Sequence, residues 1–167
     1  PNFVKEFLIN RELNRKGIEE VIVHTGQHYD YEMSKLFFED FNLPEPNYHF
    51  DNSSTSTIQQ TADIMKYMED VLKMEKTDCT LIYGDVNSTL AAAVASAKLK
   101  IPVAHIEGGV RSWSLYNPEE INRRVSDQLS ELVFACTKTD YENLLRENFA
   151  KERIVLSGDV MKDVLLF

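Results

Sequence analysis

The sequence has few of the residues that mark metal, redox or disulfide sites. Its two cysteines, Cys79 and Cys136, stand in apolar runs without CxxC spacing, so we expect two reduced, buried thiols. The four histidines lack the spacing of metal ligands, and no metal site is predicted. Neither GxGxxG nor a GxxxxGK followed by Ser or Thr occurs, which excludes the usual dinucleotide fingerprint and the P-loop from this stretch of chain.

The sequence also lacks an excess of positive charge and long apolar runs. Its 167 residues carry 18 Lys and Arg against 27 Asp and Glu, a net charge of -9. Nucleic-acid phosphates need clustered basic residues, so we expect no nucleic-acid partner. No apolar run reaches the roughly 18 residues of a membrane span, and we expect a cytoplasmic protein with no membrane partner. A helix N-terminus and one arginine could still hold an anionic small ligand.

Apolar strand-like runs alternate with helical patterns along the chain. Strands are predicted at residues 19–25, 79–83, 101–106, 132–135 and 153–156. Helices are predicted at residues 29–41, 58–72, 87–98, from 118 onward, and at 140–147, the second with an apolar face running from Ile58 through Ala62 to Leu72. This alternation with short connections predicts one α/β domain with a Rossmann-like, doubly wound parallel sheet. Ligands of such sheets bind beyond the carboxyl ends of the strands.

Ionisable residues follow several of the predicted strands. Asp85 comes after strand 79–83 and Glu107 after strand 101–106, while Glu119 or Glu120 stands in the first turn of the next helix. Since carboxyl ends of neighbouring parallel strands share one edge, these acids are expected to converge there with Arg111. Clustered carboxylates push one another's pKa values apart, which suits paired acid and base roles.

Each of these residues also has a purely structural interpretation. Asp85 could cap the following helix, and the acids at 119 and 120 could stabilise the helix dipole. Arg111 could pair with a nearby acid instead of a phosphate. His105, inside a strand, is expected to be a core histidine with satisfied hydrogen bonds, and Lys5 could be a solvated surface lysine.

Four segments in this order carry a resemblance to a known family. They are residues 25–30 (TGQHYD), 84–89 (GDVNST), 105–112 (HIEGGVRS) and 118–123 (PEEINR). Together they resemble the non-hydrolysing UDP-N-acetylglucosamine 2-epimerase family, and residues 158–161 (GDVM) are similar to its motif leading toward a second domain. Gly108, Val110 and Val86 depart from the family's common Ala, Leu and Thr, while every charged position is kept.

The resemblance implies the N-terminal half of a two-domain, glycosyltransferase-B-type fold. The first strand and the C-terminal nucleotide-binding domain would lie outside this sequence, and without them we expect poor stability and no turnover. The implied reaction interconverts UDP-GlcNAc and UDP-ManNAc by elimination and re-addition of UDP, with inversion at C2. The resemblance further implies a homodimer and no cofactor or metal.

The resemblance also implies roles for individual residues. Matched position by position, the catalytic acids fall on Asp85, Glu107 and Glu119. The substrate-binding positions, or their support, fall on Lys5, Arg111 and Arg123. A loop near which a second UDP-GlcNAc acts as allosteric activator is matched by Gln27 and His28.

Other functions remain open from the sequence. One is an epimerase acting on a UDP-2,3-diacetamido sugar, and another is a hydrolysing relative that releases free ManNAc. A retaining glycosyltransferase of similar architecture and a non-catalytic nucleotide-sugar-binding domain are the remaining alternatives. Three acids near an anionic ligand argue against the last, because binding alone does not need them.

Overall fold

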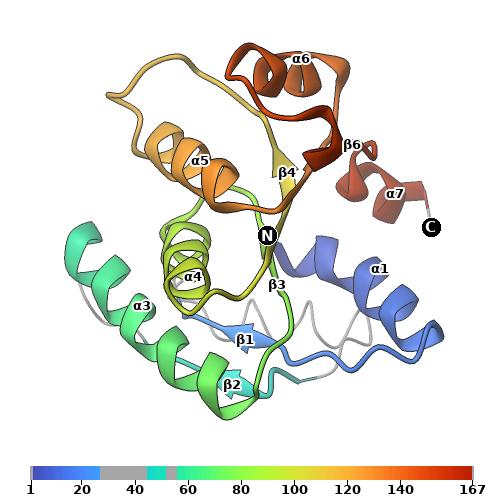
Figure 1. Ribbon diagram of the computed structural model, residues 1–167. Helices are drawn as coiled ribbons and strands as arrows, with labels where there is room; N and C mark the ends of the chain where they lie inside the picture. The colour runs from blue at the N-terminus through green and yellow to red at the C-terminus, as the bar shows by residue number, and fades with distance from the viewer. Residues whose placement is uncertain (1, 27–44, 52–55, 167) are drawn as a thin grey trace. The chain divides into compact units, whose positions relative to one another are not determined.

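The computed structural model describes residues 2–26, 45–51 and 56–166 (Figure 1). The predicted helix at 29–41 and the predicted allosteric residues Gln27 and His28 lie outside these residues. The chain divides into two compact units, one of residues 53–159 and one of residues 1–52 with 160–167.

The larger unit contains a parallel sheet of four strands in sequential order. They are β3 (Thr80–Tyr83), β4 (Val103–Gly108), β5 (Leu132–Ala135) and β6 (Ile154–Leu156). These strands confirm four of the predicted strands to within two residues at each end. Buried Val103, Val133 and Ala135 form part of the core. The sheet is parallel, as the alternation of strands and helices predicts.

Helices follow or precede each of these strands. They are α3 (Thr57–Met74), α4 (Asn87–Lys98), α5 (Pro118–Leu129) and α6 (Lys138–Arg146), with a short 3-10 helix η1 (Lys151–Arg153) before β6. Helix α4 packs between α3 and α5 (Figure 1). Its buried face consists largely of alanines, such as Ala91 and Ala95, whose small side chains permit this close packing.

The predicted apolar face of α3 is partly wrong. Ile58 and Ala62 are exposed, and the buried row begins instead at Gln60 and Ile64. Both candidate rows have three-to-four spacing and meet at Met68, so they differ only toward the N-terminal end of the helix. Apolar periodicity alone therefore identified the helix but not which side of its first two turns packs against α4.

The smaller unit contains α1 (Asn2–Arg15), α7 (Val160–Leu166) and a parallel pair of short strands, β1 (Val23–His24) and β2 (Tyr48–His49). Strand β1 is shorter than the predicted strand at 19–25. The imidazole rings of His24 and His49 stack across the pair with centroids 4.6 Å apart. Helices α1 and α7 contact each other.

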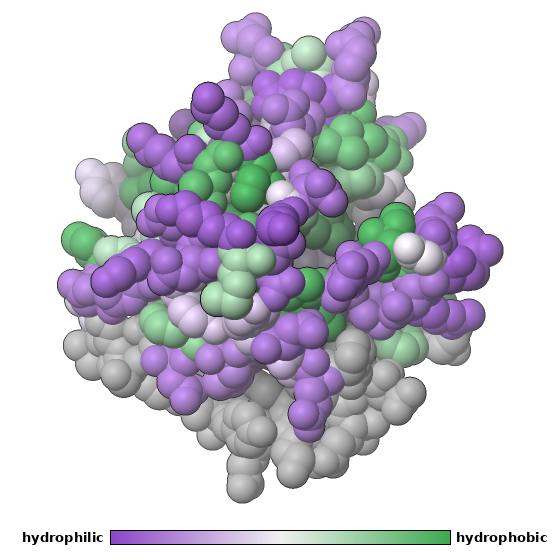
Figure 2. All heavy atoms as spheres, turned by 60° about the horizontal axis from the view of Figure 1, so that its bottom comes forward, coloured by the Kyte–Doolittle hydropathy of each residue, from purple (hydrophilic) through white to green (hydrophobic). Residues whose placement is uncertain are grey.

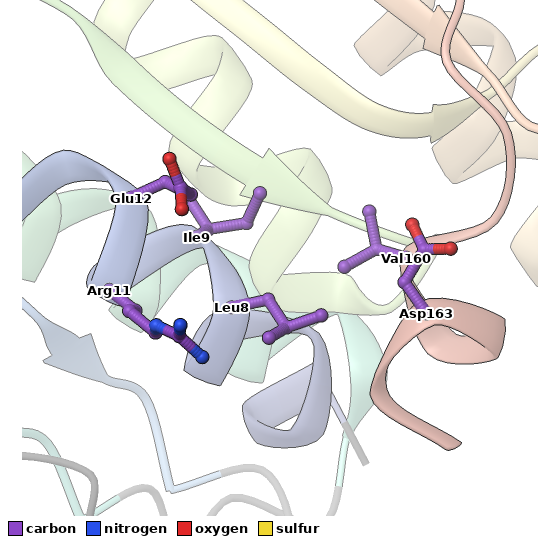
Figure 3. Close-up of a pocket in the computed structure, with 6 residues that line it drawn as sticks. All are labelled: Leu8, Ile9, Arg11, Glu12, Val160 and Asp163. Atoms are coloured by element: carbon purple, nitrogen blue, oxygen red, sulfur yellow. The ribbon is translucent and has the colours of Figure 1, made fainter. Parts of the chain in front are cut away.

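An open groove of about 370 Å³ lies between α1 and α7 (Figure 3). Its lining comes from one face of α1 and the start of α7: Leu8, Ile9, Arg11, Glu12, Val160 and Asp163. None of the predicted site residues lines it. On the face seen in Figure 2, hydrophilic residues predominate and hydrophobic ones form small separate groups.

Both cysteines are free thiols, as predicted. The prediction that both are buried is wrong: Cys79, just before β3, is exposed, and Cys136 is half-buried. None of the helices among the described residues is long and apolar enough to cross a membrane.

Candidate functional site

Asp85 and Glu107 lie at the carboxyl ends of adjacent strands. Tyr83, the last residue of β3, is the register partner of Ile106 in β4. Asp85 lies in the turn two residues after Tyr83, and Glu107 directly follows Ile106. The two acids therefore stand at the same edge of the sheet, the edge at which parallel sheets bind ligands.

Glu107 occupies an irregular position within β4. The register between β4 and β5 shifts between Ile106 and Gly108, which makes Glu107 the extra residue of a β-bulge, and its φ is 71°. A non-glycine residue in this left-handed region is strained, and bulges redirect side chains beside functional sites. The half-buried Glu107 thus leaves the regular alternation of the strand at the edge where Asp85 stands.

Asp85 is held by two residues of α5. Arg123 donates from Nε and Nη2 to the same carboxylate oxygen, Oδ2, at 2.8 and 2.5 Å. Asn122 donates to the backbone oxygen of Asp85 at 2.9 Å. Asp85 is not the N-cap residue of α4, because Val86 occupies that position and makes no capping bond with its side chain. The structural alternative for Asp85 is therefore wrong, and its carboxylate is fixed by an arginine.

The two neighbouring acids at the start of α5 have different surroundings. Asn117 caps the helix by accepting from the backbone N–H of Glu119 at 3.2 Å, and the side chain of Glu119 is exposed. Glu120 is fully buried and accepts from the backbone N–H groups of Ser112 and Trp113 at 2.8 and 3.3 Å. Glu120 thus fixes the loop after β4, while Glu119 remains accessible.

Glu120 also connects this loop to Asp85. Arg124 donates to its carboxylate at 2.9 Å, and Arg123, which holds Asp85, approaches it at 3.6 Å. Burial by itself would raise the pKa of Glu120, but hydrogen bonds from Ser112 and Arg124 outweigh that effect and lower the pKa. Glu120 is therefore a buried carboxylate that stays ionised between two arginines.

A second polar network lies inside the sheet edge. His105 is fully buried and is hydrogen-bonded to Asp127 Oδ1 and to the Gly84 carbonyl, both at 2.7 Å. This confirms His105 as a core histidine with satisfied hydrogen bonds. Asp127 Oδ2 lies 2.8 Å from Nη1 of Arg111. The Nε and Nη2 groups of Arg111 form a bidentate pair with the carboxylate of Glu147, at 2.8 and 2.7 Å.

Arg111 is thus paired with acidic side chains, which agrees with its structural interpretation from the sequence. Its side chain is fully buried, and Nη1 also donates to the carbonyl of Val110 at 2.8 Å. Burial alone would lower the pKa of the guanidinium, but Glu147 and Asp127 outweigh that effect and raise it. This geometry suits Arg111 to supporting the strand-end loop, because its guanidinium is occupied within the protein.

Lys5 belongs to the smaller unit. It lies on α1, its side chain is buried, and its amine donates to Asn2 Oδ1 at 3.2 Å. The alternative of a solvated surface lysine is therefore wrong, and its substrate-binding role stays a prediction. Among the described residues, no three or more His, Cys, Asp or Glu side chains are grouped to hold a metal ion.

The sequence analysis did not predict the roles of four residues in these networks. Glu120 was named without its role as an anchor of the loop, and Asn122, Asp127 and Glu147 were not singled out. The segment 118–123 contains the signal for the first two, since an acid and an amide precede the arginine that reaches Asp85. Asp127 carries a weaker signal, because it lies one helical turn beyond Arg123 on a helix with few apolar residues.

A family model described as UDP-N-acetylglucosamine 2-epimerase matches residues 11–167. The chain belongs to the UDP-N-acetylglucosamine 2-epimerase family. It is 43% identical to the UDP-2,3-diacetamido-2,3-dideoxy-D-glucuronate 2-epimerase of Pseudomonas aeruginosa, over all of this chain and 48% of that relative. It is 41% identical to the UDP-N-acetylglucosamine 2-epimerase of Methanocaldococcus jannaschii, over 99% of this chain and 45% of the relative. The chain thus spans about half the length of these epimerases.

Solved structures of the family agree with this fold. The M. jannaschii epimerase in complex with UDP-GlcNAc and UDP superposes with a TM-score of 0.94 at 41% identity, over 98% of this chain and 45% of that one. The Neisseria meningitidis epimerase bound to UDP-GlcNAc gives 0.91 at 33% identity, over 98% and 44%. The predicted Rossmann-like α/β fold class is confirmed.

Proposed function

We propose that the full protein containing this chain is a UDP-N-acetylglucosamine 2-epimerase that interconverts UDP-GlcNAc and UDP-ManNAc. Membership of an epimerase family supports the reaction type. The observation that carries the proposal is the placement of Asp85 and Glu107 at the ends of paired strands. Arg123 is hydrogen-bonded to the first of these acids. Inversion at C2 requires a proton to leave one face of the sugar and return to the other, which calls for more than one positioned acid or base.

The proposed reaction proceeds by elimination and re-addition. A carboxylate removes the C2 proton, the C1–O bond breaks with its electrons departing on UDP, and a C1–C2 double bond forms. C2 is then protonated on the opposite face while UDP returns to C1, so the overall change needs no oxidant or reductant. Asp85 and Glu107 act as the acid and base, and the exposed Glu119 contacts substrate.

The basic residues divide between binding and support. Arg123 orients the carboxylate of Asp85 through its Nε and Nη2 groups, which positions that carboxylate for proton transfer. Arg111 supports the loop after β4 from within the protein, and Lys5 contributes to substrate binding from α1. The homodimer, and a regulatory UDP-GlcNAc site beside Gln27 and His28, belong to the same proposal.

The test is proton exchange at C2. The full-length protein is incubated with UDP-GlcNAc in D₂O, and the C2 proton is followed by NMR. Loss of that signal together with formation of UDP-ManNAc is the expected result. Asp85→Asn and Glu107→Gln should lower the exchange rate at least 100-fold, the usual contribution of a positioned acid or base.

A matched control removes a carboxylate outside the site. Glu142 on α6 is exposed and forms a loose surface pair with Arg146 at 4.0 Å, so Glu142→Gln should leave exchange unchanged. A folded wild-type protein that binds UDP but neither exchanges C2 nor forms a new sugar would overturn the assignment of UDP-GlcNAc as substrate.

A second substrate is favoured by one specific observation. The P. aeruginosa relative, which is named for a UDP-2,3-diacetamido-glucuronate, matches the whole chain at 43% identity. Running the same exchange assay with that sugar beside UDP-GlcNAc separates the two substrates by the ratio of kcat/KM. Both substrates need the same C2 chemistry, so the roles of Asp85 and Glu107 are unchanged.

A further inference from the structure

The buried pair of His105 and Asp127 has no part in the proposed chemistry, yet it reaches both acid-bearing strand ends. His105 Nε2 bonds the carbonyl of Gly84, the residue before Asp85. Asp127 Oδ2 accepts from the backbone N–H of Gly109, two residues after Glu107, at 3.1 Å. A single side-chain pair thus joins the turn after β3 to the turn after β4.

The hydrogen bonds of His105 require two ring protons. A carbonyl oxygen only accepts, so Nε2 must donate to Gly84. On the other side, Nδ1 faces Asp127 Oδ1, and a proton lies between them. Asp127 Oδ2 already accepts from Arg111 and from the Gly109 amide, so both oxygens of this carboxylate act as acceptors and the shared proton is assigned to the histidine.

The charge balance of the surroundings supports the same state. The charged groups that face this pair are Asp127 from α5, Arg111 from the loop after β4 and, through Arg111, Glu147 from the end of α6. The neighbouring strands present apolar Ile82 and Val133 at the positions paired with His105. One arginine and two carboxylates would leave a buried excess of negative charge, which a cationic His105 cancels.

We propose that His105 is a positioning residue: a buried imidazolium that, with Asp127, holds the turns carrying Asp85 and Glu107 in fixed relation. The ion pair acts through backbone atoms, namely the Gly84 carbonyl and the Gly109 amide. The Gly109 turn has little freedom of its own, since φ is 83° and an added Cβ would lie 2.5 Å from the Asp140 carbonyl oxygen. The effect on turnover rests on the proposed epimerase function.

The protonation state is tested by NMR of the full-length protein labelled with ¹⁵N at histidine. At neutral pH, His105 should give two ring N–H correlations, which are assigned by their absence from His105→Gln. Asp127→Asn removes the partner charge while keeping its shape, so His105 should then keep a single ring proton. A wild-type His105 with only one protonated ring nitrogen overturns the proposal, whatever the substrate of the enzyme.

The positioning role is tested by the Gly109 amide and by kinetics. In His105→Gln and Asp127→Asn, hydrogen exchange of the Gly109 amide should become faster. C2 proton exchange should show kcat lowered roughly 10- to 100-fold with KM little changed, the cost of acids displaced by a fraction of an ångström to an ångström.

Ser96→Ala is the matched control. The Ser96 hydroxyl donates to Thr80 Oγ1 at 2.9 Å in the buried contact between α4 and the first residue of β3, at the opposite end of the strand. This variant also loses a buried hydrogen bond but leaves both turns untouched. If it slows C2 exchange and frees the Gly109 amide as much as Asp127→Asn does, the positioning role is refuted. If the wild type turns over no sugar, the function fails, while ring protons and amide exchange still decide this proposal.

Discussion

Replacing Glu120 with Gln removes one buried charge from the hydrogen-bond network that joins α5 to the loop after β4. The carboxylate accepts from Ser112 and Trp113 of the loop and from Arg124. A glutamine keeps one acceptor oxygen but turns an amide N–H₂ toward other donors. Removing one partner of a buried ion pair costs about 3–5 kcal/mol, and the retained acceptor places the expected loss near 3 kcal/mol.

The loss should depend on pH in a defined direction. The pKa of Glu120 is lowered from its ordinary value of 4.5 in the folded protein, so the carboxylate stabilises the fold fully above pH 4.5. That stabilisation is lost as pH falls through the lower, folded pKa, where the wild-type side chain becomes protonated and resembles the glutamine. The difference in unfolding free energy between wild type and Glu120→Gln should therefore be constant above pH 4.5 and shrink below it.

Urea unfolding followed through Trp113 measures this difference locally. Trp113 is the single tryptophan of the sequence, and its backbone N–H donates to the carboxylate of Glu120. Glu119→Gln is the control one residue away, and its exposed side chain should change stability by no more than about 0.5 kcal/mol. Equal losses in the two variants, or a Glu120→Gln loss that persists unchanged at low pH, would refute the reasoning.

Three further changes test separate parts of the fold by thermal or urea unfolding. Thr137→Ala breaks the capping box of α6, in which Thr137 and Asp140 bond each other's backbone N–H, and should cost about 1 kcal/mol; no loss would contradict the capping role. Lys100→Gly relieves a residue with φ 62° just past α4 and should gain about 0.5 kcal/mol, whereas a loss would show that the backbone there is not strained. Ser126→Ala removes a buried hydroxyl that has no hydrogen-bond partner among the described residues; it should leave stability unchanged or raise it by up to about 1 kcal/mol, and a loss above that would reveal a partner.

The elements that bury apolar faces were predictable from the sequence. Strands such as β5 are short apolar runs, and α4 is an alanine-rich segment whose predicted bounds match the structure. The start of helix α5 is marked by Pro118, a residue that suits the first helical position, and not by an apolar face, because its buried residues are polar: Glu120, Asn122, Ser126 and Asp127. Its Ile121 is 45% exposed, so hydrophobic periodicity points to the wrong side of this helix.

The candidate site was predictable in part for the same reason. Strand ends locate Asp85 and Glu107 by topology alone, since each follows an apolar run. The partners of these acids depend on tertiary contacts between residues such as Asp85 and Arg123, which are 38 positions apart. The left-handed backbone of Glu107 likewise arises from the bulge against β5, which no local pattern encodes.

The polar inward side of α5 has an evolutionary consequence. Three of its buried side chains satisfy a donor or acceptor on another segment: Glu120 on the loop after β4, Asn122 on the Asp85 turn, and Asp127 on His105. An apolar core tolerates single substitutions between side chains of similar volume. In a hydrogen-bonded network, a substitution at one residue leaves the buried donor or acceptor of its partner unsatisfied. Substitutions on this side of α5 should therefore be strongly epistatic, and descendants that alter it should differ at several of these positions together.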